Sequence, residues 1–359
     1  MRAVVLACVA VAVSAVPAHA ARPVLLGQGA DPGVAVDASG TAYVAYNGEY
    51  ADPGQPLMFC AWPRGARGCT PRALIADNAS PSAQPALVHA GAPGAVTIVS
   101  SRDTLQSLSS VDGGATFGAP AALGSATFFD GAFGPDGRLG LTYRRLGVVD
   151  FYERSLAGPA DASAHVELNR GWAVRSEVGW AGSRPVVVSG AAGSEGTAVT
   201  TWSGQGDVHD PAMWTPPRRL GKSVYYAMAS GPRGLFLAQQ VGAFRERVVV
   251  RKFNGNSFGR SRRVPAGRLG LAGIIGVALA QDATGRMVAV WHSSPRNRLE
   301  YSASRTGRRW TPARVLATGV EVPSDLQVAL GPDGRGLVVW DENTGDDIHA
   351  VPVSVRRLL

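Results

Sequence analysis

The stretch from Val277 to Trp291, VALAQDATGRMVAVW, joins two apolar runs through a short polar turn. Each run is apolar at nearly every position, as expected of strands that are buried on both faces. Within the turn, Asp282 can accept local hydrogen bonds and Gly285 can adopt a positive φ, which suits a tight hairpin. The stretch therefore predicts an antiparallel pair of buried strands.

The same pattern recurs along the chain at a mean spacing of about 49 residues. More polar third and fourth strands follow it in most units, as at 299–304 and 310–317. A repeat of this length built from strands predicts an all-β, seven-bladed β-propeller. The irregular fourth unit leaves six blades as the alternative. The seven turn glycines are Gly40, Gly94, Gly137, Gly196, Gly234, Gly285 and Gly336.

The two ends of the chain complement each other. After a third strand at 349–355 the seventh unit has no distinct fourth strand, whereas residues 21–27 are similar to the fourth strand at 313–317. We therefore expect the N-terminal strand to complete the last blade and close the ring, which removes exposed sheet edges.

Residues 1–20 have the composition of a secretory signal peptide. Arg2 precedes a small, apolar stretch that ends in Ala18-His19-Ala20, a small-x-small cleavage pattern. No later segment is long and apolar enough to span a membrane. We expect residues 21–359 to form a single propeller domain of a secreted protein that is extracellular or associated with the cell envelope.

The mature chain keeps two cysteines, Cys60 and Cys69, which flank a turn-rich segment at 63–68. In an oxidising compartment they are expected to form a disulfide across a hairpin. Two cysteines without nearby histidines do not indicate a zinc site, so we expect no metal there and no cofactor. The segment from Asp341 to Asp347 has oxygen donors around a glycine, which leaves calcium open as a ligand.

The formal net charge is +8, and lysine occurs only at Lys222 and Lys252. The arginines are scattered rather than gathered along one groove or helix, which argues against nucleic-acid binding. A basic exported protein is attracted to acidic surfaces. We expect an extracellular glycan or a surface protein as the partner, with no stable membrane span, and a monomeric state.

One segment is a specific motif. Residues 110–117, SVDGGATF, fit the pattern S-x-D-x-G-x-T-[FW] at every fixed position. This resembles the Asp-box, or BNR repeat, of the sialidase/neuraminidase-like propeller superfamily. The resemblance implies that the box joins the third and fourth strands of a blade, away from the catalytic pocket. Partial copies at Gly307–Trp310 and Gly255–Phe258 keep the spacing from glycine to aromatic residue but lack the serine and aspartate. The structural residues of the box are Ser110, Asp112, Gly114, Thr116 and Phe117.

Propeller connectivity places the loops between second and third strands on the same face as the links from one blade to the next. The resemblance to sialidases implies three arginines for a sugar carboxylate, a tyrosine–glutamate nucleophile pair and an aspartate as acid. The links between blades also contain Asp31, Asp130, Arg175, Glu177, Tyr225 and Asp325. The ligand-binding candidates on this face are Arg102, Asp103, Arg144, Tyr226, Arg247 and Asp341.

The chain departs from the sialidase pattern because the F/Y-R-I-P motif near the first strand is absent. We therefore expect a non-catalytic propeller that binds a glycan or protein on its loop-rich face. The alternative is a glycoside hydrolase of the exo-sialidase type acting on extracellular glycans. Other glycoside chemistry would need two carboxylates, such as Asp207 and Asp341.

Overall fold

The computed structural model describes residues 20–49, 55–78, 86–101, 105–124, 130–135, 137–145, 148–155, 165–170, 173–191, 198–223, 225–242, 247–266, 274–342 and 347–356. Within these ranges the chain is all-β, as predicted, and has no α-helix. Two short 3-10 helices are present, η1 (Pro211–Met213) and η2 (Ser294–Arg296). None of the described segments is a helix that could cross a membrane.

Five antiparallel sheets contain four strands each. Their strands, sheet by sheet, are β5 (Leu87–Ala90), β6 (Val96–Ser101), β7 (Leu105–Ser110) and β8 (Ala121–Gly124); β9 (Asp130–Phe133), β10 (Arg138–Arg145), β11 (Val148–Ser155) and β12 (His165–Arg170); β13 (Ala173–Ala181), β14 (Arg184–Ala191), β15 (Ala198–Ser203) and β16 (Arg218–Lys222); β17 (Tyr226–Ala229), β18 (Phe236–Val241), β19 (Arg247–Lys252) and β20 (Arg262–Arg263); β21 (Ile274–Gln281), β22 (Met287–Ser293), β23 (Arg298–Ser304) and β24 (Arg314–Thr318).

The sixth sheet joins the two ends of the chain. Its strands are, in spatial order, β25 (Pro323–Leu330), β26 (Arg335–Glu342), β27 (Asp347–Ser354), β1 (Val24–Val36), β2 (Ala42–Gly48), β3 (Gln55–Trp62) and β4 (Arg72–Asn78). The first part of β1 pairs with β27, where Val24 lies opposite Ala350. The second part pairs with β2, where Val36 lies opposite Ala42. A single strand therefore belongs to two four-stranded groups.

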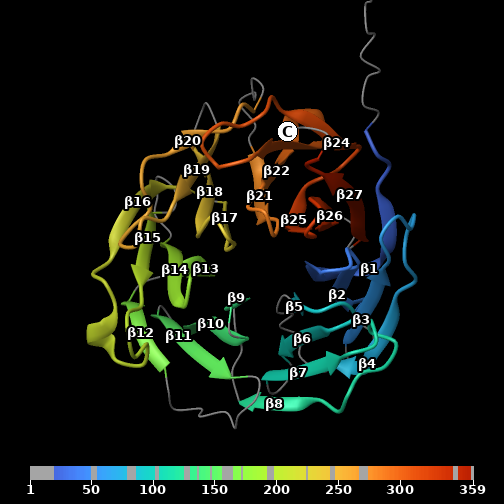
Figure 1. Cartoon of the computed structure of the whole chain (residues 1–359), viewed down its shortest axis with the longest axis horizontal. Coiled ribbons are helices and arrows are strands. Elements are labelled where there is room, and N and C mark those ends of the chain that lie inside the picture. The colour runs from blue at the N-terminus through green and yellow to red at the C-terminus, as the bar shows by residue number, and fades with distance from the viewer. Residues whose placement is uncertain are drawn as a thin grey trace, which may run out of the picture.

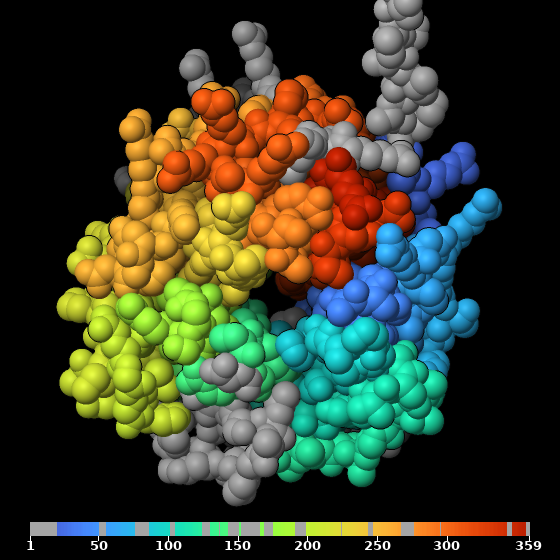
Figure 2. Space-filling model, viewed as in Figure 1, coloured from blue at the N-terminus to red at the C-terminus, as the bar shows by residue number. Residues whose placement is uncertain are grey.

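The sheets stand around a central opening (Figure 1). In each group the first strand lies innermost and the fourth lies outermost, so β5, β9, β13, β17, β21 and β25 surround the centre together with part of β1. The space-filling view shows that the centre is hollowed on the face that is drawn (Figure 2).

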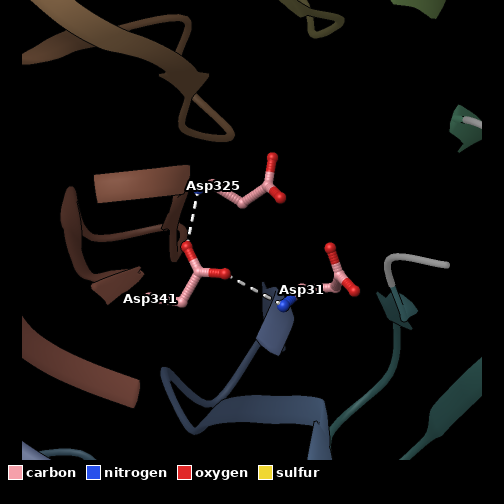
Figure 3. A group of neighbouring side chains, drawn as sticks. All are labelled: Asp31, Asp325 and Asp341. Atoms are coloured by element: carbon pink, nitrogen blue, oxygen red, sulfur yellow. Dashed lines mark hydrogen bonds between the residues drawn. The ribbon is translucent and has the colours of Figure 1, made fainter. Parts of the chain in front are cut away.

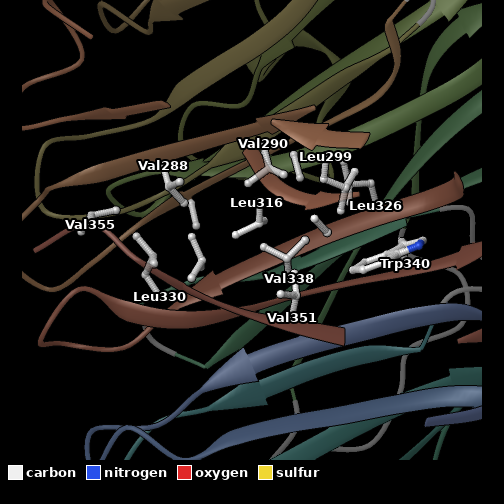
Figure 4. Packing of buried hydrophobic residues seen from close by; sticks show 14 of the residues in the cluster. Val288, Val290, Leu299, Leu316, Leu326, Leu330, Val338, Trp340, Val351 and Val355 are labelled. Carbon is white, nitrogen blue, oxygen red and sulfur yellow. The ribbon is translucent and has the colours of Figure 1, made fainter. Parts of the chain in front are cut away.

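In the part of the chain that the structure describes, seven apolar clusters hold neighbouring groups together. Alternate residues of one strand belong to different clusters. In β22, Val288 and Val290 pack toward β25–β27 (Figure 4), whereas Met287, Ala289 and Trp291 pack toward β17–β20. Both faces of such a strand are buried, which explains its uninterrupted apolar sequence. Burial between sheets is the main source of stability in this arrangement, since it removes apolar surface from water.

The tight hairpins have the expected chemistry. One carboxylate oxygen of Asp282 accepts the amides of Thr284 (2.8 Å) and Arg286 (2.9 Å), and Gly285 has a φ of 79°. The sequence pattern assigned the wrong glycine to two turns, those of the seventh and fourth units. The seventh turn uses Gly334, with a φ of 75°, while Gly336 lies inside β26.

The fourth unit was also placed in the wrong register. Its first hairpin turns at Gly182, with a φ of 65°, between β13 and β14. Gly196 falls between β14 and β15 and lies outside the described residues. The first strand was missed because β13 carries the polar residues Arg175, Ser176 and Glu177 where other first strands are apolar.

Candidate functional site

Three aspartates from different strands meet near the centre of the ring (Figure 3). Asp31 lies where the register of β1 shifts, Asp325 lies in β25 and Asp341 in β26. Each offers a carboxylate oxygen within 4.8 Å of the others. Asp341 accepts the main-chain amide of Asp325 at 2.7 Å and that of Asp31 at 3.3 Å, so it fixes the two other strands relative to its own.

A second group of charged side chains borders the same space. Arg175 in β13 forms an ion pair with Glu177 at 2.9 Å. Asp130 in β9 accepts the main-chain amide of Val178 at 2.7 Å. The negative charge of Asp325 acts on both Arg175 and Glu177, which ties this group electrostatically to the three aspartates. We call Asp31, Asp130, Arg175, Glu177, Asp325 and Asp341 the axial cluster.

The axial cluster contains five carboxyl groups and one guanidinium group. Because like charges repel, the ionisation of one carboxyl group disfavours the ionisation of its neighbours. Burial, followed by repulsion from Asp325, raises the pKa of Asp31 to about 8. The same two causes raise the pKa of Asp341 to about 6. Burial also raises the pKa of Asp130 and that of Glu177, although Arg175 opposes the rise at both groups. The cluster therefore holds protons at a pH where exposed carboxylates have lost them.

A cavity of about 330 Å³ lies beside the cluster. It is lined by residues of six innermost strands, among them Gly33, His89, Asp130, Val178, Met228 and Gln327. The His89 ring stacks on Phe133 with the ring centroids 4.6 Å apart, and burial lowers the pKa of this histidine. The cavity thus combines the carboxyl group of Asp130 with aromatic and apolar side chains, as small-molecule sites commonly do.

Two of the residues selected from the sequence belong to the axial cluster or contact it. Asp341 belongs to the axial cluster. Tyr226 lies in β17, is fully buried and donates its hydroxyl to the main-chain oxygen of Arg175 at 2.5 Å. The Arg175 guanidinium lies 5.9 Å from the centre of the Tyr226 ring. Burial raises the pKa of Tyr226, so this hydroxyl is held as a neutral donor.

The other selected residues do not meet in the described part of the chain. Arg102 and Asp103 lie outside the described residues. Arg144 pairs with Val149 through the main chain of β10, and only its main chain is described. Arg247 begins β19 and is exposed.

The structure adds Asp31, Asp130, Arg175, Glu177 and Asp325 to the site. Their signal in the sequence was their place in the predicted links between blades, which belong to the loop-rich face. The suggested pairing of Asp207 with Asp341 is wrong. Asp207 follows β15, a third strand, and is exposed, so it lies on a link between third and fourth strands.

The SVDGGATF segment forms the link between β7 and β8. Ser110 accepts the amide of Gly114 at 2.9 Å, and Asp112 accepts the amide of Thr116 at 2.9 Å. Hydrogen bonds from Thr116 are the main reason that the pKa of Asp112 lies well below its usual range. Phe117 packs edge-on against Phe59 of β3 with ring centroids 5.0 Å apart, which joins this link to the neighbouring group.

One partial copy has a serine that the sequence pattern missed. Ser304 accepts the amide of Gly307 at 2.8 Å, the contact that Ser110 makes with Gly114. The serine precedes its glycine by three residues rather than four, which hid it from the fixed spacing. Cys60 and Cys69 form the predicted disulfide, with their Cα atoms 5.8 Å apart.

No family model and no curated protein matches the sequence. Solved structures match over most of its length. The BP39L lectin from Burkholderia pseudomallei is 10% identical at a TM-score of 0.56, with 92% of this chain and 97% of the lectin covered. The β-propeller domain of the Trilobed protease from Pyrococcus furiosus is 8% identical at a TM-score of 0.51, with 92% and 95% covered. The chain has a β-propeller fold.

A third similar structure is that of α-L-arabinanase from Penicillium chrysogenum complexed with arabinobiose. It is 10% identical at a TM-score of 0.52, with 94% of this chain and 99% of the arabinanase covered. At these identities the propellers share their architecture with this chain, and their activities are their own.

Proposed function

We propose that this protein is an exported, non-catalytic seven-bladed propeller that binds a neutral glycan at the axial cluster. The observation that carries the proposal is the gathering of five carboxyl groups and one arginine beside a cavity at the centre of the ring. Carboxylates accept several hydrogen bonds each, and sugar hydroxyl groups supply donors in fixed pairs. A surface protein that presents hydroxyl or ammonium groups would offer the axial cluster the same kind of hydrogen-bond donors.

Seven blades and a closed ring are part of this proposal. Two observations support them: β1 pairs with both β27 and β2, and seven apolar clusters lie between successive four-stranded groups, including the one between β26–β27 and β1–β3. The proposal also takes residues 1–20 as a cleaved leader and residues 21–359 as one domain. The disulfide between Cys60 and Cys69 fits an oxidising compartment.

Membership of the Asp-box superfamily is proposed on the contacts of one segment. Ser110 and Asp112 accept amides within their own turn, and Phe117 packs on the adjacent group. These contacts give the motif a structural role, and they stand apart from the axial cluster.

The charge of the axial cluster argues against a sialic acid ligand. A sialoside carboxylate would be repelled by the negative charges of Asp325 and Asp341, and Arg175 is already paired with Glu177. The Tyr226 hydroxyl is bonded to a main-chain oxygen, which leaves it poorly placed to attack a sugar. A neutral or amino sugar suits this site better than an acidic one.

Glycoside hydrolysis is the second candidate, and one observation favours it. Asp31, with a pKa raised to about 8, keeps a proton at neutral pH beside the more acidic Asp341. Glycosidases use such a pair, with one protonated carboxyl as the acid and a nearby carboxylate as base or nucleophile. In this candidate reaction the bond that is hydrolysed is the glycosidic bond of a neutral sugar.

The test measures binding and turnover on the same panel. Purified protein is titrated calorimetrically with neutral, amino and sialylated oligosaccharides, with and without calcium, and is incubated with the matching fluorogenic glycosides. We expect a neutral or amino sugar to bind without turnover. Asp341→Asn should weaken binding by about tenfold or more, because a hydrogen bond to a charged group is lost.

The exposed Asp207→Asn serves as the matched control and should bind like the wild type. Turnover of a neutral glycoside that Asp31→Asn abolishes would support the second candidate instead. Strong binding of a sialoside that survives Asp341→Asn would contradict both. A requirement for calcium would place the ion on the three aspartates, whose oxygens suit it chemically.

A further inference from the structure

A groove of about 480 Å³ lies between the β17–β20 sheet and the β21–β24 sheet. Phe236 and Val250 form its floor. Its walls come from the turn between β17 and β18, from the link between β19 and β20, and from the link between β23 and β24. We call it the basic groove, after the basic residues that line it: Arg233, Lys252, Arg260, Arg262 and Arg308.

All five basic side chains are exposed, and no carboxylate of the described residues lines the groove. Among the described residues, none of the five forms an ion pair with an acidic group. Elsewhere on the surface arginines do find partners, as Arg64 does with Asp333 at 2.8 Å and Arg286 with Asp282 at 2.6 Å. Like charges gathered without partners raise the local potential and attract anions.

Local contacts position the backbone and one cation of the groove. Gly307 has a φ of 72°, and a Cβ atom there would lie 2.5 Å from the ring of Phe236, so the link passes directly over the floor. Ser304 fixes this link by accepting the Gly307 amide at 2.8 Å. The Lys252 ammonium lies 5.7 Å from the centre of the Phe236 ring, which restrains its position as well. Preorganised cations lose less freedom when they bind a ligand.

The basic groove and the axial cluster belong to opposite faces. The groove is built from a first-to-second turn and third-to-fourth links of the sheets β17–β20 and β21–β24. The axial cluster lies in β1, β9, β13, β25 and β26, toward the strand ends that are remote from the first-to-second turns. The chain therefore has an acidic site at its centre and a basic site between two blades on the other side.

We propose that the basic groove binds an oligosaccharide that carries sulfate or phosphate groups. Arginine forks match tetrahedral oxyanions through paired hydrogen bonds, and four of the five cations are arginines. The volume lies within the range of small-ligand sites. Nucleic acids are bound along extended basic tracks, and this cluster is confined to one short groove. This site does not depend on the function proposed for the axial cluster.

The test uses a heparin-derived hexasaccharide as the sulfated probe, titrated calorimetrically at low and physiological salt. The groove variant is the double charge reversal Arg233→Glu with Lys252→Glu. Its matched control is Arg218→Glu with Arg219→Glu, which removes two exposed arginines of β16 and changes the net charge equally. We expect the groove variant to bind at least tenfold more weakly and the control to stay within about threefold of the wild type.

Thermal unfolding checks that both variants fold. Should the groove variant unfold early, Arg262→Gln with Arg308→Gln gives the milder form of the same test. The proposal also requires that the desulfated hexasaccharide lose affinity and that affinity fall as salt rises. It is overturned if the wild type does not bind the sulfated probe, if both double variants lose affinity equally, or if a single-stranded oligonucleotide binds more tightly than the hexasaccharide.

Discussion

Asp31 combines a φ of 55° with a carboxyl group that faces two other carboxylates. Aspartate tolerates this left-handed conformation better than most residues. The residue lies in the register shift between Ala30 and Gly33, just after β1 has changed partner from β27 to β2. The path of β1 therefore determines both the backbone conformation of Asp31 and the position of its carboxyl group.

Asp31→Asn should stabilise the protein at pH 8 and leave it nearly unchanged at pH 4. The folded chain keeps the Asp31 proton up to about pH 8, whereas the unfolded chain loses it near pH 4. Between these values the folded state binds more protons, so the wild type loses stability as pH rises. Since Asp31 is partly exposed, we expect a gain on the order of 1–2 kcal/mol at pH 8 rather than the full shift. Thermal unfolding of both proteins from pH 4 to 8 measures it.

In this titration the exposed Asp207→Asn should follow the wild type at every pH. A gain for Asp31→Asn that is the same at pH 4 and pH 8 would show that the effect does not come from the ionisation of Asp31.

At the scale of strands and turns, the sequence was sufficient to locate the strands of a unit wherever its first strand is apolar. It predicted the hairpin from Val277 to Trp291 and the fourth strands near Arg72, Arg263 and Arg314. It failed in β13, because residues that face the centre of the ring are polar there. The same polarity that makes β13 part of the candidate site removed the apolar signal that identifies a strand.

Gly114→Ala tests the link between β7 and β8. Its φ is 83°, and a Cβ atom there would lie 2.4 Å from the Phe59 ring. Gly65 has a similar φ of 81° but open space around it, so Gly65→Ala is the matched control. We expect a loss of about 1 kcal/mol for Gly65→Ala from backbone strain alone. Gly114→Ala should lose about 2–4 kcal/mol in urea unfolding, because the ring must also move.

Equal losses for the two alanine variants would contradict the packing of Phe59 against the link. A loss confined to Gly65→Ala would contradict it as well.

At the scale of the whole molecule, ring geometry decides which loop residues meet. The sequence identified the starts of the first strands as candidate positions, including Asp31, Asp130 and Asp325. It could not select among them, because their distances depend on how far each first strand reaches toward the centre. Arg102 and Arg144 were favoured by the resemblance to sialidases, whereas the structure gathers carboxylates.

Leu26 and Leu25 test whether the N-terminal strand is docked in solution. Leu26 is 6% exposed and packs in the cluster with Val339 and Ile348, whereas Leu25 is 56% exposed. Leu26→Ala should cost about 2–3 kcal/mol in the free energy of unfolding. Leu25→Ala should cost no more than about 0.5 kcal/mol. Similar values for these neighbours would mean that the strand is not packed against β27.

The shared strand β1 has a consequence for how the molecule is made. Val24 precedes its partner Ala350 by 326 residues in the sequence (350 − 24), so it is synthesised well before that partner. At ordinary rates of translation the strand waits on the order of half a minute for that partner. Until then the main-chain N–H and C=O groups on this edge of β1 must form hydrogen bonds with water or with a chaperone. The pairing of β1 with β27 can therefore form only after β27 has been synthesised.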